Sequence, residues 1–281
     1  MGFKLSWSDY ILDLDERTHV MGVLNVTPDS FSDGGRYFGP DRAVEHGLQM
    51  ARDGADIVDV GGESTRPYAK RLTCSEEMDR VIPVIEALKR ELSIPISIDT
   101  YKSEVAQGCL NAGASIINDI SALRFDPHMA SVAAQGDVPL ILMHMKGTPE
   151  NMQENPLYHD LISEISEFLK DAIDRCVAAG VREDLILVDP GIGFGKTFDH
   201  NLAVIKELSR FKSLGRPILL GTSNKAFIGH ILGKGANERE TGSMATVAAG
   251  VMNGAHIVRV HNVKKTVETV RVIDAIRRGE A

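Results

Sequence analysis

The chain has 281 residues, of which 43% are apolar and only 5% aromatic, and its formal net charge at pH 7 is −8. This length is usual for a single α/β barrel, and the apolar share is enough for a substantial core. The negative charge and the absence of a basic stripe argue against a nucleic-acid-binding surface. No apolar run approaches the roughly 20 residues of a membrane span. We therefore expect neither a nucleic acid, because of the charge, nor a membrane, because of the missing span, as a partner.

Cysteine usage and the first residues bear on the cellular compartment. Cys74, Cys109 and Cys176 are widely separated and form no CxxC pair, which is typical of a reducing compartment. The opening segment, MGFKLSWSDYILDLDE, turns acidic too early for a secretory signal. We therefore expect a cytoplasmic protein.

In chain order, an alternating segment at residues 5–18 predicts a small β-hairpin, and a regular succession of strands and helices follows it. The predicted strands cover residues 19–24, 57–60, 94–98, 115–118, 139–143, 185–188, 217–220 and 256–260. The amphipathic stretches between them predict helices over 75–92, 102–112, 160–179, 201–212, 241–253 and 264–278. Short, continuous apolar runs of this kind are typical of strands buried on both faces, as in parallel sheets.

Eight such strands alternating with helices predict a (β/α)8 TIM barrel with a short N-terminal β-hairpin. The alternative is a doubly wound open sheet, although eight repeats are many for one open sheet. No linker or low-complexity tract interrupts the pattern, so we expect one domain over residues 1–281.

Polar residues follow every predicted strand, at the barrel face where this fold carries its chemistry. They are Asn25, the segment GGESTRP (61–67), Asp99 with Thr100, Asn118 with Asp119, Met143 with His144, the segment DPGIGFGKT (189–197), the segment GTSNKAFIG (221–229), and Arg259 with His261. Each one alone can be a helix cap or a turn residue. Eight polar strand ends together favour a binding site.

The cations at these ends are Arg66, Lys225, Arg259 and His261. They converge on one face if the fold is a barrel, and helix dipoles at that face also favour anions. A multiply charged oxyanion is therefore the expected ligand. The segment PGIGFGKT (190–197) is no Walker phosphate loop, because its glycine spacing is one residue too short.

A second group of strand-end residues consists of Asp99, Asn118 and Asp189. Carboxylates accept hydrogen bonds from a guanidine-like edge, and an amide both donates and accepts. This trio therefore suits a planar heterocycle rich in N–H donors.

The chain resembles the dihydropteroate synthase family of folate biosynthesis. The resemblance runs from the first hairpin to the last helix. The motifs that carry it are MGVLNVTPDSFSDGG (21–35), DIVDVGGESTRP (56–67), ISIDT (96–100), IINDI (116–120), MHMKGTPENMQ (143–153), LVDPGIGFGKT (187–197), LLGTSNKAFIG (219–229) and VRVHNV (258–263). The first of these is highly specific.

The resemblance implies a pterin-binding transferase that condenses 6-hydroxymethyl-7,8-dihydropterin diphosphate with p-aminobenzoate and releases pyrophosphate. It further implies a (β/α)8 barrel, a homodimer, and Mg²⁺ as cofactor with Asn25 as its ligand. Two rival hypotheses stay open. One is a pterin-dependent methyltransferase domain, and the other is a catalytically silent pterin-binding homologue.

The implied site residues fall into groups by substrate. Those for the pterin are Asp99, Asn118, Met143, Asp189 and Lys225; those near the diphosphate are Thr65, Arg259 and His261; those for p-aminobenzoate are Phe31, Pro67, Phe194 and Lys225. Arg66 and the phosphate-facing Asp33 belong to loops that would fold over the substrates. The implied catalytic residues are Asp99, Lys225, Arg259 and His261.

Three positions leave specific questions. Phe31 lies in an otherwise polar loop, where it serves the p-aminobenzoate site or, alternatively, holds the loop against the barrel rim. The family pattern Ser-Arg-Lys-Ser reads SNKA at residues 223–226, so the last serine is Ala226. Tyr68 stands where the family has glycine. The missing hydroxyl predicts a weaker hold on the carboxylate of p-aminobenzoate.

Overall fold

Eight parallel strands form the centre of the computed structural model, which describes residues 2–26, 40–64 and 71–280. They are β3 (His19–Asn25), β4 (Ile57–Gly61), β5 (Ile96–Asp99), β6 (Ile116–Asp119), β7 (Leu140–Met143), β8 (Ile186–Asp189), β9 (Leu219–Leu220) and β10 (Ile257–Val260). Hydrogen bonds join them in the order β8-β7-β6-β5-β4-β3-β10-β9. A parallel bridge from Val188 in β8 to Ile218 beside β9 brings the two edges together. The predicted barrel is confirmed.

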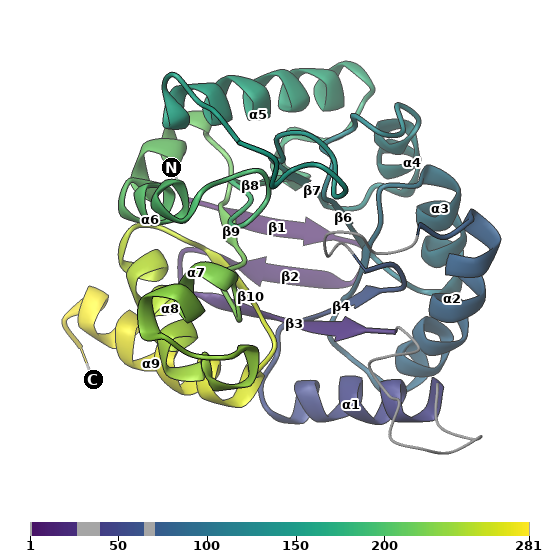
Figure 1. Ribbon diagram of the computed structural model, residues 1–281. Helices are drawn as coiled ribbons and strands as arrows, with labels where there is room; N and C mark the ends of the chain where they lie inside the picture. The colour runs from purple at the N-terminus through teal and green to yellow at the C-terminus, as the bar shows by residue number, and fades with distance from the viewer. Residues whose placement is uncertain (1, 27–39, 65–70, 281) are drawn as a thin grey trace.

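Helices surround the strands as an outer ring (Figure 1). They are α1 (Pro40–Arg52), α2 (Cys74–Glu91), α3 (Ser103–Ala112), α4 (Met129–Gly136), α5 (Leu161–Ala178), α6 (Phe198–Lys206), α7 (Ala226–Leu232), α8 (Glu240–Met252) and α9 (Val263–Arg278). Among the described residues, none of these helices is both long and apolar enough to cross a bilayer.

Most predicted elements agree with the observed ones to within two residues, whereas α1, α4 and α7 lie outside the predicted helices, and two further elements differ more strongly. The strand predicted over 217–220 is reduced to the two residues of β9, because Pro217 has no backbone N–H and Ile218 donates its N–H to His256 Nδ1 at 3.0 Å instead of to a strand. The helix predicted over 201–212 is instead α6 followed by a 3-10 helix, η3 (Leu208–Leu214). The two meet at Glu207, whose ψ of 18° lies outside the α-helical range.

Capping residues set the start of several helices. The Thr73 side chain accepts a hydrogen bond from the Glu76 backbone in a capping box at α2, and Asp160 accepts one from Ser163 at α5. Such caps satisfy N–H groups that have no partner inside the helix. Because a helix follows each parallel strand, the N-termini of these helices face the same end of the barrel as the carboxyl ends of the strands.

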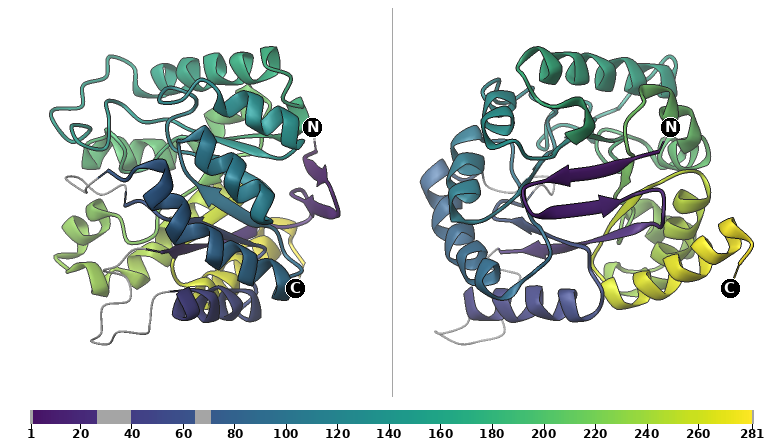
Figure 2. Two further views of the ribbon diagram at one scale, coloured as in Figure 1. Left: turned by 90° about the vertical axis from the view of Figure 1, so that its right-hand side faces the viewer. Right: turned by 180° about the vertical axis from the view of Figure 1, so that it is seen from behind.

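The N-terminal hairpin, β1 (Lys4–Trp7) and β2 (Tyr10–Asp13), lies across the opposite end of the barrel (Figure 2). Its Leu5 and Trp7 side chains are almost fully buried in the main core. Trp7 borders a hollow of about 470 Å³ together with Val138, which precedes β7. The hairpin therefore covers the end where the strands begin and leaves the other end to the site.

Candidate active site

An ion triad centred on Arg259 joins three strands inside the mouth of the barrel. The Arg259 guanidinium donates from Nε to Asp59 Oδ2 at 2.6 Å and from Nη2 to Asp99 Oδ2 at 2.5 Å. Asn118 donates from Nδ2 to the same Asp59 oxygen at 3.2 Å. Asp99 and Asn118 are direct neighbours in the β5–β6 register. The structure thus brings three predicted site residues together through one residue that was not predicted.

The electrostatics of the triad are set by burial and by its own charges. Burial raises the pKa of the Asp99 carboxyl to about 7, although the Arg259 charge opposes this, and Asp59 raises it further. For Arg259, burial alone would lower the pKa, but Asp59 and Asp99 outweigh it and raise the pKa above its ordinary value. Asp99 is therefore a carboxyl group that can change its protonation or its partner near neutral pH.

Asp59 is the residue that sequence reasoning missed. It lies within β4, so a search of the residues at strand ends does not include it. Its side chain is fully buried. Within the described part of the chain its Oδ1 has no hydrogen-bond partner. The sequence did contain a signal for it, namely a carboxylate inside the apolar run IVDVG (57–61). A charge buried in a strand requires a partner, so this pattern indicates an ion pair inside the barrel.

Asp189 and Lys225 lie at the next part of the mouth, at the end of β8 and at the start of α7. Asp189 Oδ1 accepts the Gly191 backbone N–H at 2.7 Å, and burial raises the pKa of this carboxyl. Gly191 adopts φ 71°, and a Cβ there would lie 1.9 Å from the His144 carbonyl oxygen. Only glycine allows this close approach.

The Lys225 ammonium lies 4.4 Å from the centroid of the Phe194 ring, within the range of a cation–π contact. Burial, followed by the nearby charge of Arg259, lowers the pKa of Lys225 to about 8. Phe194 also packs on a small apolar cluster that contains Met143. These predicted residues are therefore brought together: an ammonium, an aromatic ring and an apolar wall.

His261 and Asn25 lie at the rim. His261 Nδ1 is 3.0 Å from Ser223 Oγ, which also accepts the His261 backbone N–H. Asn25 ends β3 and is exposed. A Cβ placed on Gly61 would lie 3.9 Å from Asn25 Oδ1 and 3.8 Å from Asp99 Oδ2, so these oxygens flank the same glycine. Phe31, Asp33, Thr65, Arg66, Pro67 and Tyr68 lie outside the described residues.

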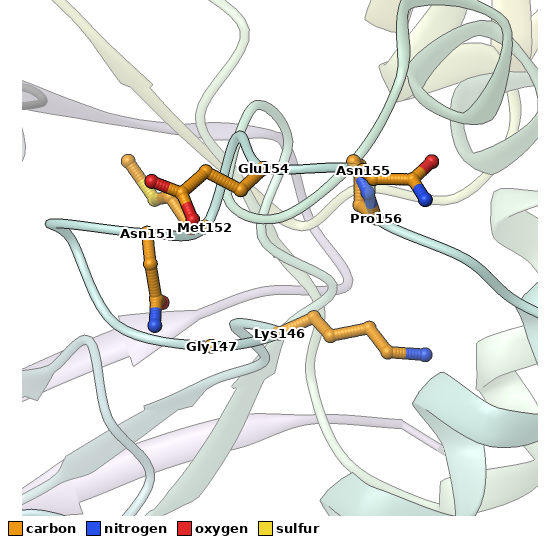
Figure 3. A pocket seen from close by; sticks show the side chains of 7 residues that line it. All are labelled: Lys146, Gly147, Asn151, Met152, Glu154, Asn155 and Pro156. Atoms are coloured by element: carbon orange, nitrogen blue, oxygen red, sulfur yellow. The ribbon is translucent and has the colours of Figure 1, made fainter.

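A separate hollow of about 220 Å³ lies within the loop after β7 (Figure 3). It is lined by Lys146, Gly147, Asn151, Met152, Glu154, Asn155 and Pro156. All of these belong to one segment, and none is a predicted site residue. Lys146 is engaged outside the hollow, by the Leu157 carbonyl and by the Tyr158 ring at 4.1 Å. The hollow therefore does not contain the ion triad, but it adjoins the site through Met152, which packs in the same cluster as Met143 and Phe194.

A (β/α)8 barrel that gathers buried charged side chains at the carboxyl ends of its strands is typical of an enzyme. The family model described as "Pterin binding enzyme" matches residues 21–261. The chain therefore belongs to the pterin-binding enzyme family. Within that family, the relatives include dihydropteroate synthases. The enzyme from Bacillus subtilis (strain 168) is 51% identical over 94% of this chain and 90% of its own, and that from Escherichia coli (strain K12) is 47% identical over 94% and 93%.

Solved structures agree with the sequence comparison. The Yersinia pestis dihydropteroate synthase, in complex with a sulfonamide drug, is 44% identical with a TM-score of 0.93, over 98% of this chain and 100% of that one. The Xanthomonas albilineans enzyme with 4-aminobenzoic acid is 42% identical with a TM-score of 0.92, over 99% of both chains. The same enzyme has been solved with 7,8-dihydropteroate, at 40% identity and a TM-score of 0.89, over 98% of both chains.

Proposed function

We propose that this protein is the transferase that condenses 6-hydroxymethyl-7,8-dihydropterin diphosphate with p-aminobenzoate to give 7,8-dihydropteroate and pyrophosphate. The observation that supports the proposal is the Asp59–Arg259–Asp99 triad, in which a guanidinium, a group suited to an anion, lies beside carboxylates, which suit the N–H edge of a heterocycle. The relatives that bind 4-aminobenzoic acid and 7,8-dihydropteroate support the same reaction.

The pterin ring would occupy the deep part of the mouth. Asp99 and Asp189 accept hydrogen bonds from its N–H edge, and the Asn118 amide both donates and accepts. Because both carboxylates are buried, such bonds are stronger than in water, and a dry carboxylate left unpaired is costly. Met143 packs against the face of the ring, together with the apolar cluster that it shares with Phe194.

The diphosphate would lie at the rim, near Arg259 and His261, with Thr65 and Arg66 from the loop after β4. Pyrophosphate leaves poorly until its charge is neutralised, so cations placed where negative charge develops accelerate its departure. Asp33 belongs to the loop after β3 that would close over this group. Asp99 and Asp189 would stabilise positive charge on the pterin methylene if the bond breaks before the amine attacks.

The aromatic amine would pack between the Phe194 ring and the aliphatic part of Lys225, with Phe31 and Pro67 as further walls. The 4.4 Å contact between the Lys225 ammonium and Phe194 supports this arrangement. An ammonium beside the aromatic wall also attracts the carboxylate of p-aminobenzoate. Water excluded from this space cannot trap a cationic intermediate.

We expect a raised KM for p-aminobenzoate, because Ala226 provides no hydroxyl for its carboxylate. Ala226 is exposed and begins α7 directly after Lys225. A hydrogen bond to a charged group is worth about 1.5–3 kcal/mol, and the backbone N–H replaces only part of it. The substitution Ala226→Ser should therefore lower this KM and leave pterin affinity unchanged. Steady-state kinetics check this, and an unchanged or higher KM would show that the hydroxyl is irrelevant here.

The residues present fit Mg²⁺ only as a partner of the diphosphate. Asn25 Oδ1 is a suitable hard ligand, but the nearby Asp99 oxygen is already paired with Arg259. Among the described residues, no group of three or more His, Cys, Asp or Glu could hold a metal ion. When bound, the metal would neutralise diphosphate charge. The protein itself would supply Asn25 and leave the remaining positions to the substrate.

Chelation of Mg²⁺ is accordingly expected to abolish turnover while the thermal midpoint of the protein stays unchanged. Added Mg²⁺ should restore activity fully, since the metal arrives largely with the diphosphate. Pyrophosphate release and thermal denaturation, measured on the same sample with and without chelator, check this. Tight Mg²⁺ binding by the protein without substrate, measured by calorimetry, would contradict it.

We also propose that residues 1–281 act as one domain, and that the protein works as a homodimer in the cytoplasm. The family resemblance supports the dimer, and the scattered cysteines support the compartment. In the structure all three cysteines are unpaired, and Cys109 and Cys176 are buried. Analytical ultracentrifugation of the purified chain tests the dimer.

Pyrophosphate release tests the proposed function against its rivals. A synthase releases pyrophosphate when Mg²⁺, the pterin diphosphate and p-aminobenzoate are present together. A pterin-dependent methyltransferase domain would bind the pterin and release none. A silent homologue would likewise release none and would fail to restore growth of a strain that lacks the enzyme.

A further inference from the structure

A buried lysine in the loop that follows β8 has no part in the chemistry proposed above. The Lys196 side chain is among the largest that are fully buried, with a relative exposure of 2%. Its Nζ donates to the carbonyl oxygen of Gly191 at 2.9 Å and of Phe194 at 3.2 Å, and lies 2.9 Å from His144 Nδ1. Burial lowers the pKa of Lys196 to about 7. Its ammonium form has three donors and no acceptor, so these three partners satisfy it completely.

The state of His144 fixes the direction of the third hydrogen bond. Burial, followed by the charge of Lys196, lowers the pKa of His144 well below its ordinary value, so the imidazole is neutral. Its Nδ1 then accepts from Lys196, and Nε2 carries the ring proton. Lys196 is therefore a donor to two points on one loop and to the end of the neighbouring strand β7.

The loop needs such a support because its backbone is intrinsically free. Gly191, Gly193 and Gly195 adopt φ values of 71°, 86° and 65°, which glycine enters at no steric cost but also leaves easily. Asn201 accepts the Gly193 N–H at 2.7 Å, and this is a second support for the loop. Lys196 is the support that reaches both the start of the turn and the residue that bears the aromatic ring.

The two carbonyls that Lys196 holds belong to functional parts of the site. Gly191 is the residue whose N–H is bound by Asp189, and Phe194 carries the ring beside the Lys225 ammonium. Asp189 is the last residue of β8 and pairs with Met143 of β7, so the sheet holds its backbone in place. Phe194 lies beyond the strand and within the glycine-rich turn, so its position depends more strongly on Lys196.

We propose that Lys196 is a positioning residue for the second substrate. Its ammonium, held between His144 and the turn, fixes the backbone at Phe194 so that the ring stands beside Lys225 and forms a wall for p-aminobenzoate. Lys196 itself touches no substrate. This inference rests on the proposed function, because it assigns the Phe194 wall to the aminobenzoate half of the same site.

Steady-state kinetics of Lys196→Met test the proposal. The thioether side chain keeps the length and removes all three donors, so we expect KM for p-aminobenzoate to rise about tenfold or more. KM for the pterin diphosphate and kcat at saturation should change by less than about threefold, which corresponds to well under one hydrogen bond. Lys206→Met, an exposed lysine on α6, is the matched control and should behave as wild type.

A second variant and a double-mutant cycle separate positioning from general stability. Lys196→Gln retains amide donors for part of the network, so its KM for p-aminobenzoate should fall between those of wild type and Lys196→Met; it also carries the test if the methionine variant does not fold. In a Phe194→Ala background, Lys196→Met should add no further rise in this KM, because both changes act through the same ring.

Three results would overturn the inference. The first is an equal rise in KM for both substrates in Lys196→Met, and the second is an effect of Lys196→Met that persists undiminished in the Phe194→Ala background. The third is unaltered kinetics in both Lys196→Met and Lys196→Gln. The first would mean that Lys196 merely stabilises the barrel. Failure of the proposed function is distinguishable from these, because the wild-type protein would then release no pyrophosphate. A wild type that turns over, with variants that leave the KM ratio unchanged, contradicts the role of Lys196 alone.

Discussion

Arg259→Ala is expected to abolish most turnover and to destabilise the fold at the same time. The guanidinium is the partner of two buried carboxylates, Asp59 and Asp99, and removing one member of a buried ion pair costs about 3–5 kcal/mol in the free energy of unfolding. Affinity for the pterin diphosphate should fall, whereas affinity for the unphosphorylated pterin should be spared. Calorimetry with both ligands checks this, and equal losses for the two would sink the assignment of Arg259 to the diphosphate.

The stability loss in Arg259→Ala should depend on pH. In the native state, burial raises the pKa of Asp99 to about 7, above its unfolded value, even though Arg259 opposes the shift. A carboxyl whose native pKa is raised stabilises the fold less as pH rises from the unfolded to the native pKa. Without Arg259 this pKa rises further, so the variant should lose more stability at pH 8 than at pH 5. Urea titrations at the two values measure it, with Arg259→Lys as the charge-conserving control.

Asp99→Asn is expected to weaken pterin binding and turnover together. The substitution keeps the shape but removes the charge from an acceptor at the end of β5, and a hydrogen bond to a charged group is worth about 1.5–3 kcal/mol. That corresponds to a loss of affinity of about 10- to 150-fold. Arg259 retains its bond to Asp59, so the fold should survive.

Calorimetry with the unphosphorylated pterin and kcat/KM for the full reaction measure the effect of Asp99→Asn. Asp174→Asn, an exposed carboxylate on α5, is the matched control. Normal affinity and normal turnover would mean that Asp99 is only a turn residue at the end of its strand.

Apolar periodicity was sufficient to predict the barrel, because each strand is buried on both faces and each helix on one. It could not predict the length of β9, because Pro217 lacks an N–H and the N–H of Ile218 is bound by the His256 side chain. Nor could it foresee that α6 stops at Lys206 and continues as a 3-10 helix, since the side-chain pattern is the same in both. Propensity is local, whereas these limits depend on the fit of each element to its neighbours.

The strand-end rule placed Asp99, Asn118 and Arg259 at one mouth but not their mutual contacts. Asp59 was missed because it lies inside β4, two strands away from β10 in the sheet order, and reaches Arg259 only across the barrel interior. Lys196 was also not predicted, because a lysine in a glycine-rich loop is expected to be exposed to solvent, whereas the structure buries it fully. The first contact arises because β4 and β10 both pair with β3, and the second because β7 and β8 are neighbours; no short window of sequence contains either arrangement.

The N-terminal hairpin gives the protein a built-in optical reporter. Trp7 is the sole tryptophan of the chain, and it is buried at the end of the barrel opposite to the strand-end cluster. Its emission should shift to longer wavelength when the hairpin separates from the core and water reaches the indole ring. Substitutions at Arg259 or Asp99 leave this environment untouched, so a single fluorescence signal can report unfolding in every variant without recalibration.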